Sequence, residues 1–141
     1  MYAISLWQPW ASFISAELKP FETRAWKPPK WLIGKRIAIH AAKKIPDRVD
    51  REWAAHHRLS EIPFGAVVCT AILRGAYQMP TEDENFGALV QGSPKLAAIR
   101  IDEFGDYSPG RWAWWLTDIE RFEPPIPARG SRGFFEWNRD G

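Results

Sequence analysis

The stretch from Ser5 to Arg24, SLWQPWASFISAELKPFETR, crowds side chains with binding chemistry into a short part of the chain. These side chains are Trp7, Gln8, Trp10, Lys19, Glu22 and Arg24. A core-forming segment has little use for so many polar groups beside aromatic rings. A site that stacks on a flat ring and pairs with its polar edge uses both kinds of group. The stretch therefore predicts a ligand site.

Lys19, Glu22 and Arg24 form the charged part of this stretch. Glu22 and Arg24 lie two residues apart on a predicted strand and share a face, and Lys19 enters from the preceding turn. A carboxylate between two cations is expected to stay ionised, which suits an acceptor of N–H groups or an orienting residue better than a general acid. The alternative is a surface ion network that contributes little to stability.

Trp7, Gln8 and Trp10 form the aromatic part. An indole that stacks on a base, with an amide nearby to read its edge, is a common way to hold an unstacked nucleotide. Trp10 also falls at helical spacing with Phe13 and Ile14, so we expect it in the core. For Trp7 and Gln8 both interpretations stay open, since Gln8 could equally pin a turn.

A second cluster lies farther along the chain. His40, Lys43 and Lys44 come at the end of a predicted buried strand, where sites tend to form. His40 is either a general base or, more commonly, a core histidine with satisfied hydrogen bonds. In the sequence ARGSRG, Arg129, Ser131 and Arg132 alternate with glycines, which let a backbone approach a ligand closely and let its N–H groups meet a phosphate. The alternative is a solvated basic turn.

These residues need a mixed set of elements to position them. The sequence pattern predicts strands over 1–7, 21–26, 36–44, 65–74, 111–123 and 134–137, and helices over 9–17 and from about Asp47. Residues 80–94 are acidic and irregular, and PPIPARGSRG is predicted to be a rigid loop. Of Trp112 and Trp114, the one that points inward is expected in the core. The helices are too few for alternating βαβ units, so the fold class is α+β.

Bulk properties narrow the function only in part. The chain has 141 residues, which fits one domain, and a net charge of +2, which permits a nucleic-acid partner without arguing for one. Cys69 is expected to be buried in a reducing compartment. No signal peptide or membrane-spanning run is visible, so we expect a cytoplasmic protein. The common enzyme signatures and metal-ligand spacings are absent, so no metal or cofactor is expected.

Three stretches resemble the ASCH domain family, a branch of the PUA-like superfamily. They are ISLWQPWASFISAELKPFETRAW, IAIHAAK and RWAWWLTDIERFEPPIPARGSRGFFEW. The resemblance implies a PUA-like mixed β-barrel of about six strands flanked by two or three helices, spanning 1–141 as a single domain. Its cleft would be lined by the family box, which Lys19, Glu22 and Arg24 match. Glu17 stands where the box usually has glycine, so the turn before Lys19 is expected to be less tight.

The resemblance implies a nucleic-acid-binding module that recognises single-stranded nucleic acid, with RNA favoured over DNA, or a modified nucleotide. The predicted binding residues are Trp7, Gln8, Lys19, Glu22, Arg24, His40, Lys43, Arg129, Ser131 and Arg132. The alternative is a hydrolase, a ribonuclease or an amidohydrolase of acetylated cytidine, in which Lys19 would polarise the scissile group and Glu22 would place a water. The amidohydrolases have a threonine where Glu22 stands, and Thr23 faces the opposite side. A protein or peptide partner is a third alternative.

Overall fold

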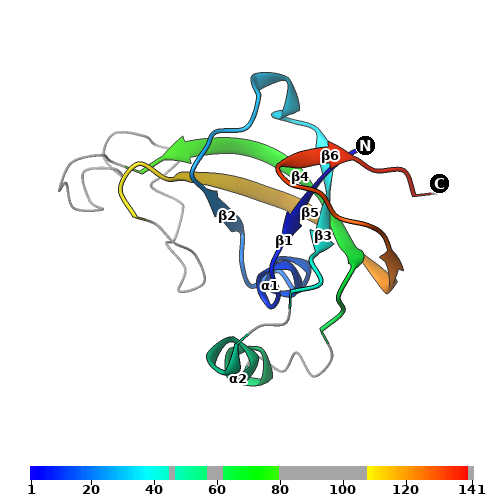
Figure 1. Ribbon diagram of the computed structural model, residues 1–141. Coiled ribbons are helices and arrows are strands. Elements are labelled where there is room, and N and C mark those ends of the chain that lie inside the picture. The colour runs from blue at the N-terminus through cyan, green and yellow to red at the C-terminus, as the bar shows by residue number, and fades with distance from the viewer. Residues whose placement is uncertain (45–46, 57–61, 80–107, 140–141) are drawn as a thin grey trace. The chain divides into compact units, whose positions relative to one another are not determined.

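A computed structural model describes residues 1–44, 47–56, 62–79 and 108–139 (Figure 1). The elements are β1 (Tyr2–Leu6), α1 (Trp10–Ser15), β2 (Phe21–Arg24), a short 3₁₀ helix η1 (Lys30–Leu32), β3 (Arg36–Ala41), α2 (Arg48–His56), β4 (Ala66–Gln78), β5 (Trp112–Pro127) and β6 (Phe134–Glu136). The predicted acidic stretch at 80–94 lies outside the described residues.

The six strands form one mixed sheet in the order β2-β5-β4-β3-β1-β6. The β1–β3 pair is parallel, whereas β1–β6, β2–β5 and β3–β4 are antiparallel. A mixed sheet with few short helices is an α+β architecture, which confirms the predicted fold class. In the described part of the chain, no helix is long and apolar enough to cross a membrane.

The chain divides into two compact units. The first unit comprises Met1–Leu18, Arg36–Ile72 and Thr117–Gly141, and the second comprises Lys19–Lys35 and Leu73–Leu116. Strands β4 and β5 contribute residues to both units. That the whole chain forms a single domain stays a prediction.

The core of the first unit is built on β1 and β3. Both strands are almost wholly buried, which explains their near-continuous apolar sequences YAISL and RIAIHA. Their parallel register pairs Ala3 with Ala38 and Leu6 with Ala41. Because parallel strands end at the same edge of a sheet, the residues after Leu6 and after Ala41 emerge together there.

Helix α1 packs its apolar side into the first unit. Phe13 and Ile14 are fully buried, as their spacing predicts. Trp10, expected in the core, is only half-buried, with its ring centroid 5.7 Å from that of Phe13. It is the first residue of the helix, so no preceding helical turn lies against its indole.

The end of α1 corrects the expectation of a looser turn before Lys19. The Glu17 N–H donates to the Ile14 carbonyl and the Leu18 N–H to the Phe13 carbonyl, which together form a Schellman motif. Glu17 sits at the left-handed position of this motif, with φ of 61°. The turn closes fully because Glu17 adopts the conformation that glycine takes at lower cost.

In the second unit, β2 lies antiparallel to the first residues of β5. Glu22 is opposite Trp114, and Thr23 is opposite Ala113. Phe21 packs in an apolar cluster with Ala113, Met79 and Trp115, so Glu22 and Arg24 take the other face of the strand. This confirms the predicted alternation, although β2 ends at Arg24 rather than at residue 26.

Strand β5 runs to Pro127, whereas the sequence pattern predicted a loop from Pro124 onward. In the described residues, β2 pairs only with Trp112–Trp115 of this strand. Beyond Leu116, whose N–H donates to the Pro20 carbonyl, β5 has no partner in β2 for its amides. Proline lacks the amide donor and is tolerated at such an edge, so the prolines did not end the strand.

Candidate nucleic-acid interface

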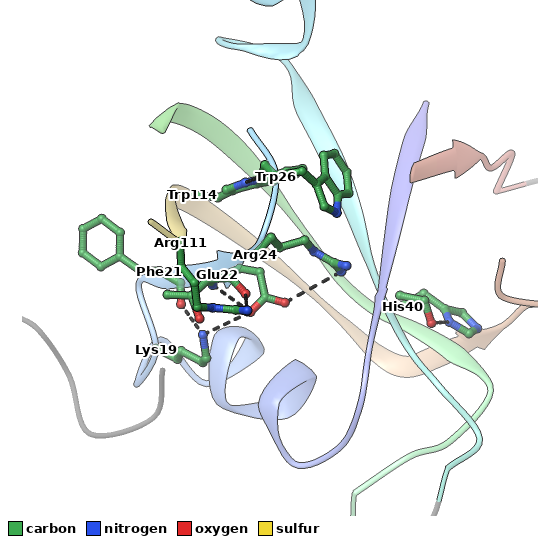
Figure 2. A network of polar contacts seen from close by, with 10 residues as sticks. Lys19, Phe21, Glu22, Arg24, Trp26, His40, Arg111 and Trp114 are labelled. Carbon is green, nitrogen blue, oxygen red and sulfur yellow. Dashed lines mark hydrogen bonds and ion pairs between the residues drawn. The ribbon is translucent and has the colours of Figure 1, made fainter. Parts of the chain in front are cut away.

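The lysine and glutamate of the box form a buried ion pair in the second unit. The Lys19 ammonium lies 3.4 Å from Oε1 of Glu22, and Lys19 is only 2% exposed. The same ammonium donates to the backbone carbonyl of Phe21. Oε1 of Glu22 also accepts a hydrogen bond from the Thr23 N–H at 3.0 Å. These bonds hold the start of β2 in place (Figure 2).

Arg24 extends this network towards aromatic rings. Its Nη2 lies 3.8 Å from Oε2 of Glu22. Its guanidinium carbon lies 5.8 Å from the ring centroid of Trp26 and 6.0 Å from that of Trp114, within the range of a cation–π contact. The two indoles meet edge to face, and Nε1 of Trp114 donates to the Trp26 carbonyl. Arg24 is therefore fixed between a carboxylate and two indoles.

The charge of Arg24 is costly where it lies. Burial lowers the pKa of Arg24, the Glu22 carboxylate opposes this effect, and the charge of Arg111 adds to it. Arg111 also donates through Nη2 to the Thr23 carbonyl at 2.9 Å. A second arginine thus reinforces β2 while it increases the positive potential near Arg24. Such a potential favours an acidic ligand group.

Three predicted site residues therefore converge, since Lys19, Glu22 and Arg24 form one network. The enzyme alternative requires Lys19 to reach a substrate, and its buried ammonium already serves Phe21 and Glu22. Hydrolysis stays a prediction that this arrangement does not favour. Within the described ranges, no group of three or more His, Cys, Asp or Glu side chains is placed to hold a metal.

In the described residues of the first unit, Trp7 is the most exposed large aromatic side chain, ahead of Phe64. Trp7 is 57% exposed, and the Lys44 ammonium lies 3.3 Å from the centroid of its ring. Trp7 follows β1 and Lys44 follows β3, at the edge where both parallel strands end. The Ala42 N–H donates to the Leu6 carbonyl and keeps these two segments side by side.

Gln8 has an internal role. Its Nε2 donates to the Ser12 hydroxyl and to the Pro63 carbonyl, both at 2.7 Å, and its Oε1 accepts from the Ser12 N–H. It is 1% exposed, and its two amide hydrogens serve Ser12 and Pro63. Gln8 thus pins the start of α1, which was one of its two sequence interpretations. A role in reading a base stays a prediction and would require these bonds to open.

His40 is a buried histidine with satisfied hydrogen bonds, as most core histidines are. It is 2% exposed, with Nδ1 2.9 Å from the Ser5 hydroxyl and Nε2 2.7 Å from the Ala128 carbonyl. Its ring meets Phe135 edge to face. A direct ligand contact by His40 stays a prediction, whereas its contact with the segment after β5 is a finding.

That segment brings the second basic cluster to the same edge. The Ala128 N–H donates to the Gly65 carbonyl, and the Gly65 N–H donates to the Ala41 carbonyl at the end of β3. Lys43 lies over Gly65, where an added Cβ would meet its side chain at 2.8 Å. The exposed side chains at this edge are Trp7, Lys43, Lys44, Arg129, Ser131 and Arg132, which we call the basic aromatic surface.

Sequence reasoning missed two contributors. Trp26 and Arg111 complete the network around Arg24. Trp26 had a usable signal, because it stands two residues after Arg24 in FETRAW. The contact of Arg111 with Thr23 spans 88 residues of sequence separation and has no local signal.

Comparisons with known proteins identify the fold of this chain. No family model matches the sequence, and no curated protein matches it significantly. Solved structures do match, among them the crystal structure of ASCH from Zymomonas mobilis, which is 20% identical. That match covers 99% of this chain and 88% of the other, with a TM-score of 0.57.

Two mutants of the same Zymomonas mobilis protein, a tyrosine-to-phenylalanine and a serine-to-alanine variant, match at 20% and 21% identity. Both cover 97% of this chain, and 89% and 87% of the other chains, each with a TM-score of 0.55. At this level of identity the likeness is one of fold. The motifs in the sequence and the near-complete structural coverage agree, and the chain has an ASCH-domain fold.

Proposed function

We propose that this protein is a nucleic-acid-binding module that holds single-stranded RNA, or a modified nucleotide within it, on the basic aromatic surface. The observation that carries the proposal is the exposed Trp7 ring with the Lys44 ammonium 3.3 Å from its centroid. Indoles usually bury their large apolar area. One held in solvent beside a cation offers a face for a base and a charge for its phosphate.

The neighbours of Trp7 support the same chemistry. Lys43, Arg129 and Arg132 are exposed side chains of the same edge of the sheet. Cations spaced along a surface meet successive phosphates of a strand, while an aromatic ring stacks on a base without regard to its sequence. The surface thus fits a single strand, whose bases are free to stack, better than a duplex.

In the second unit, Arg24 suits contact with an acidic group. Its guanidinium is held between Glu22 and two indoles, and desolvation lowers its pKa. A phosphate beside it would offset part of that desolvation. Because Lys19 is buried and engaged, we assign it to holding Glu22, and Glu22 to orienting Arg24.

Binding is tested by titrating the protein with labelled single-stranded RNA and with DNA of the same sequence, at four salt concentrations. We expect RNA to bind more tightly, and the logarithm of the binding constant to fall with the logarithm of salt by about 0.7 for each phosphate contacted. An oligonucleotide with one acetylated cytidine tests the modified-nucleotide version. No binding, or binding that does not respond to salt, would contradict the proposal.

A further inference from the structure

The segment from Ala128 to Arg132 is exposed, yet one of its ends is tied to the core. Arg129, Gly130, Ser131 and Arg132 all lie in solvent. The buried His40 ring binds the Ala128 carbonyl through Nε2 and the Ser5 hydroxyl through Nδ1. A side chain of β3, braced by one of β1, therefore holds the start of an exposed basic loop.

The chemistry of this contact fixes the ring. A carbonyl oxygen only accepts hydrogen bonds, so Nε2 of His40 must carry a hydrogen. In the neutral ring Nδ1 then accepts from the Ser5 hydroxyl, and both ring nitrogens are used. A flip or a rotation of the imidazole would break at least one of these two hydrogen bonds. The ring is therefore a rigid support.

Gly130 lies directly against this support. A Cβ at Gly130 would stand 2.6 Å from Cε1 and 2.8 Å from Nδ1 of His40, and 3.1 Å from the Ser5 hydroxyl oxygen. Contacts below 3.0 Å require atoms to move, and the atoms met here belong to a buried ring. Glycine is thus required at this position for the loop to rest on His40.

We infer that Ser5 and His40 are positioning residues for this loop, and that they present Arg129 and Arg132 to the phosphates of the bound strand in a preset arrangement. The inference rests on the proposed function. Exposed loops are ordinarily mobile, and ordering them on binding costs affinity. A loop already fixed at Ala128 and Gly130 avoids part of that cost, so His40 contributes to binding without touching the ligand.

The salt dependence of RNA binding separates positioning from a purely structural role. In His40→Leu the loop loses its support, so the two arginines no longer meet fixed phosphates. We expect about tenfold weaker binding, and a salt slope that is shallower by about 1.4, which corresponds to two phosphate contacts on a single strand. The double variant Arg129→Ala/Arg132→Ala should show the same slope, and adding His40→Leu to it should change nothing further. His56→Leu, on the exposed side of α2, is the matched control and should bind as the unaltered protein does.

Two milder variants keep the inference testable if His40→Leu does not fold. Ser5→Ala removes one hydroxyl, and Gly130→Ala displaces the loop from the ring. Each should stay folded by circular dichroism and flatten the salt slope in the same direction. If both fold and keep the original slope, or if His40→Leu weakens binding with the slope unchanged, the inference is wrong. Failure of the unaltered protein to bind RNA would instead contradict the proposed function.

Discussion

The Lys44 ammonium lies 3.3 Å from the centroid of the Trp7 ring, although the two residues follow different strands of the sheet. The parallel pairing of β1 with β3 brings them together, because both strands end at the same edge. A cation over an exposed indole contributes only about 0.5–1 kcal/mol to stability. The contribution of this pair to RNA affinity is therefore more informative to measure than its contribution to stability.

Replacing Trp7 with alanine should weaken binding of single-stranded RNA while leaving stability nearly unchanged. Loss of one stacked base corresponds to about 1–3 kcal/mol, or roughly five- to 150-fold in affinity. Fluorescence anisotropy measures the affinity, and thermal unfolding checks the fold. Trp31→Ala is the control, since Trp31 is 49% exposed and lies in the 3₁₀ helix η1. If Trp31→Ala loses as much RNA affinity as Trp7→Ala, Trp7 is not part of the RNA interface.

Glu22→Ala should destabilise the protein strongly. It leaves the buried Lys19 ammonium without its carboxylate, and breaking a buried pair in this way costs about 3–5 kcal/mol. Glu22→Gln keeps an oxygen that accepts from the Thr23 N–H, so its cost should be smaller. Urea unfolding gives the free energies. Glu120→Ala removes the ion pair between Arg36 and the exposed Glu120 and should cost little free energy of unfolding. If Glu22→Ala costs no more than this control, the network of Lys19, Glu22 and Arg24 does not stabilise the protein.

Glu17→Gly should raise the free energy of unfolding by about 0.5–1 kcal/mol. The left-handed conformation at φ of 61° costs a residue with a side chain about 1–2 kcal/mol, and part of this gain is lost to the greater freedom of glycine in the unfolded chain. The midpoint of thermal unfolding should rise by a few degrees. Glu17→Ala keeps the strain and should not stabilise. If Glu17→Ala also raises the free energy of unfolding, the stabilisation comes from loss of the Glu17 charge and not from relief of backbone strain.

Raising the pH above 9 should lower the free energy of unfolding through the buried thiol of Cys69. Burial raises its pKa from 9.0 to about 12, against smaller opposing effects of the Arg121 charge and a hydrogen bond with Ser15. The unfolded chain loses this proton near pH 9, whereas the folded protein keeps it until about pH 12. The contribution to stability is therefore complete below pH 9 and is lost as the pH rises through this range, by at most about 1.4 kcal/mol per pH unit.

The Cys69→Ala variant isolates that effect, because the two proteins differ in no other titratable group. The difference in free energy of unfolding between the two should stay constant below pH 9 and shrink above it. Urea unfolding at pH 7, 8, 9, 10 and 11 measures this difference. A difference that stays constant up to pH 11 would show that the thiol is more accessible to water than its burial indicates.

Sequence pattern predicted the elements well where apolar periodicity is strong. The strands beginning at Tyr2, Arg36 and Ala66 and the helix after Pro9 appear where expected, and Cys69 is buried as predicted. The error at Pro124 has a physical cause. Proline is a signal for a loop only where the sheet needs an amide donor, and the sequence does not show which side of a strand is paired.

The candidate site was predictable only in its local part. Lys19, Glu22 and Arg24 converge because strand alternation and a preceding turn already bring them together. The support of Ala128 by His40 joins residues 88 apart in sequence, and no periodicity reveals such a contact. Gln8 shows a different difficulty. A polar residue in a binding motif can use its side-chain hydrogen bonds within the protein, as Gln8 does with Ser12 and Pro63.

The contact between Gly130 and His40 has a consequence for related sequences. Since a Cβ at Gly130 would stand 2.6 Å from the imidazole, the two positions cannot vary independently. Chains that keep a histidine at this point of β3 should keep glycine in the loop, and chains with a smaller residue there can admit a side chain. Co-variation of the positions of His40 and Gly130 across related chains would therefore indicate in which of them the loop packs against the histidine ring.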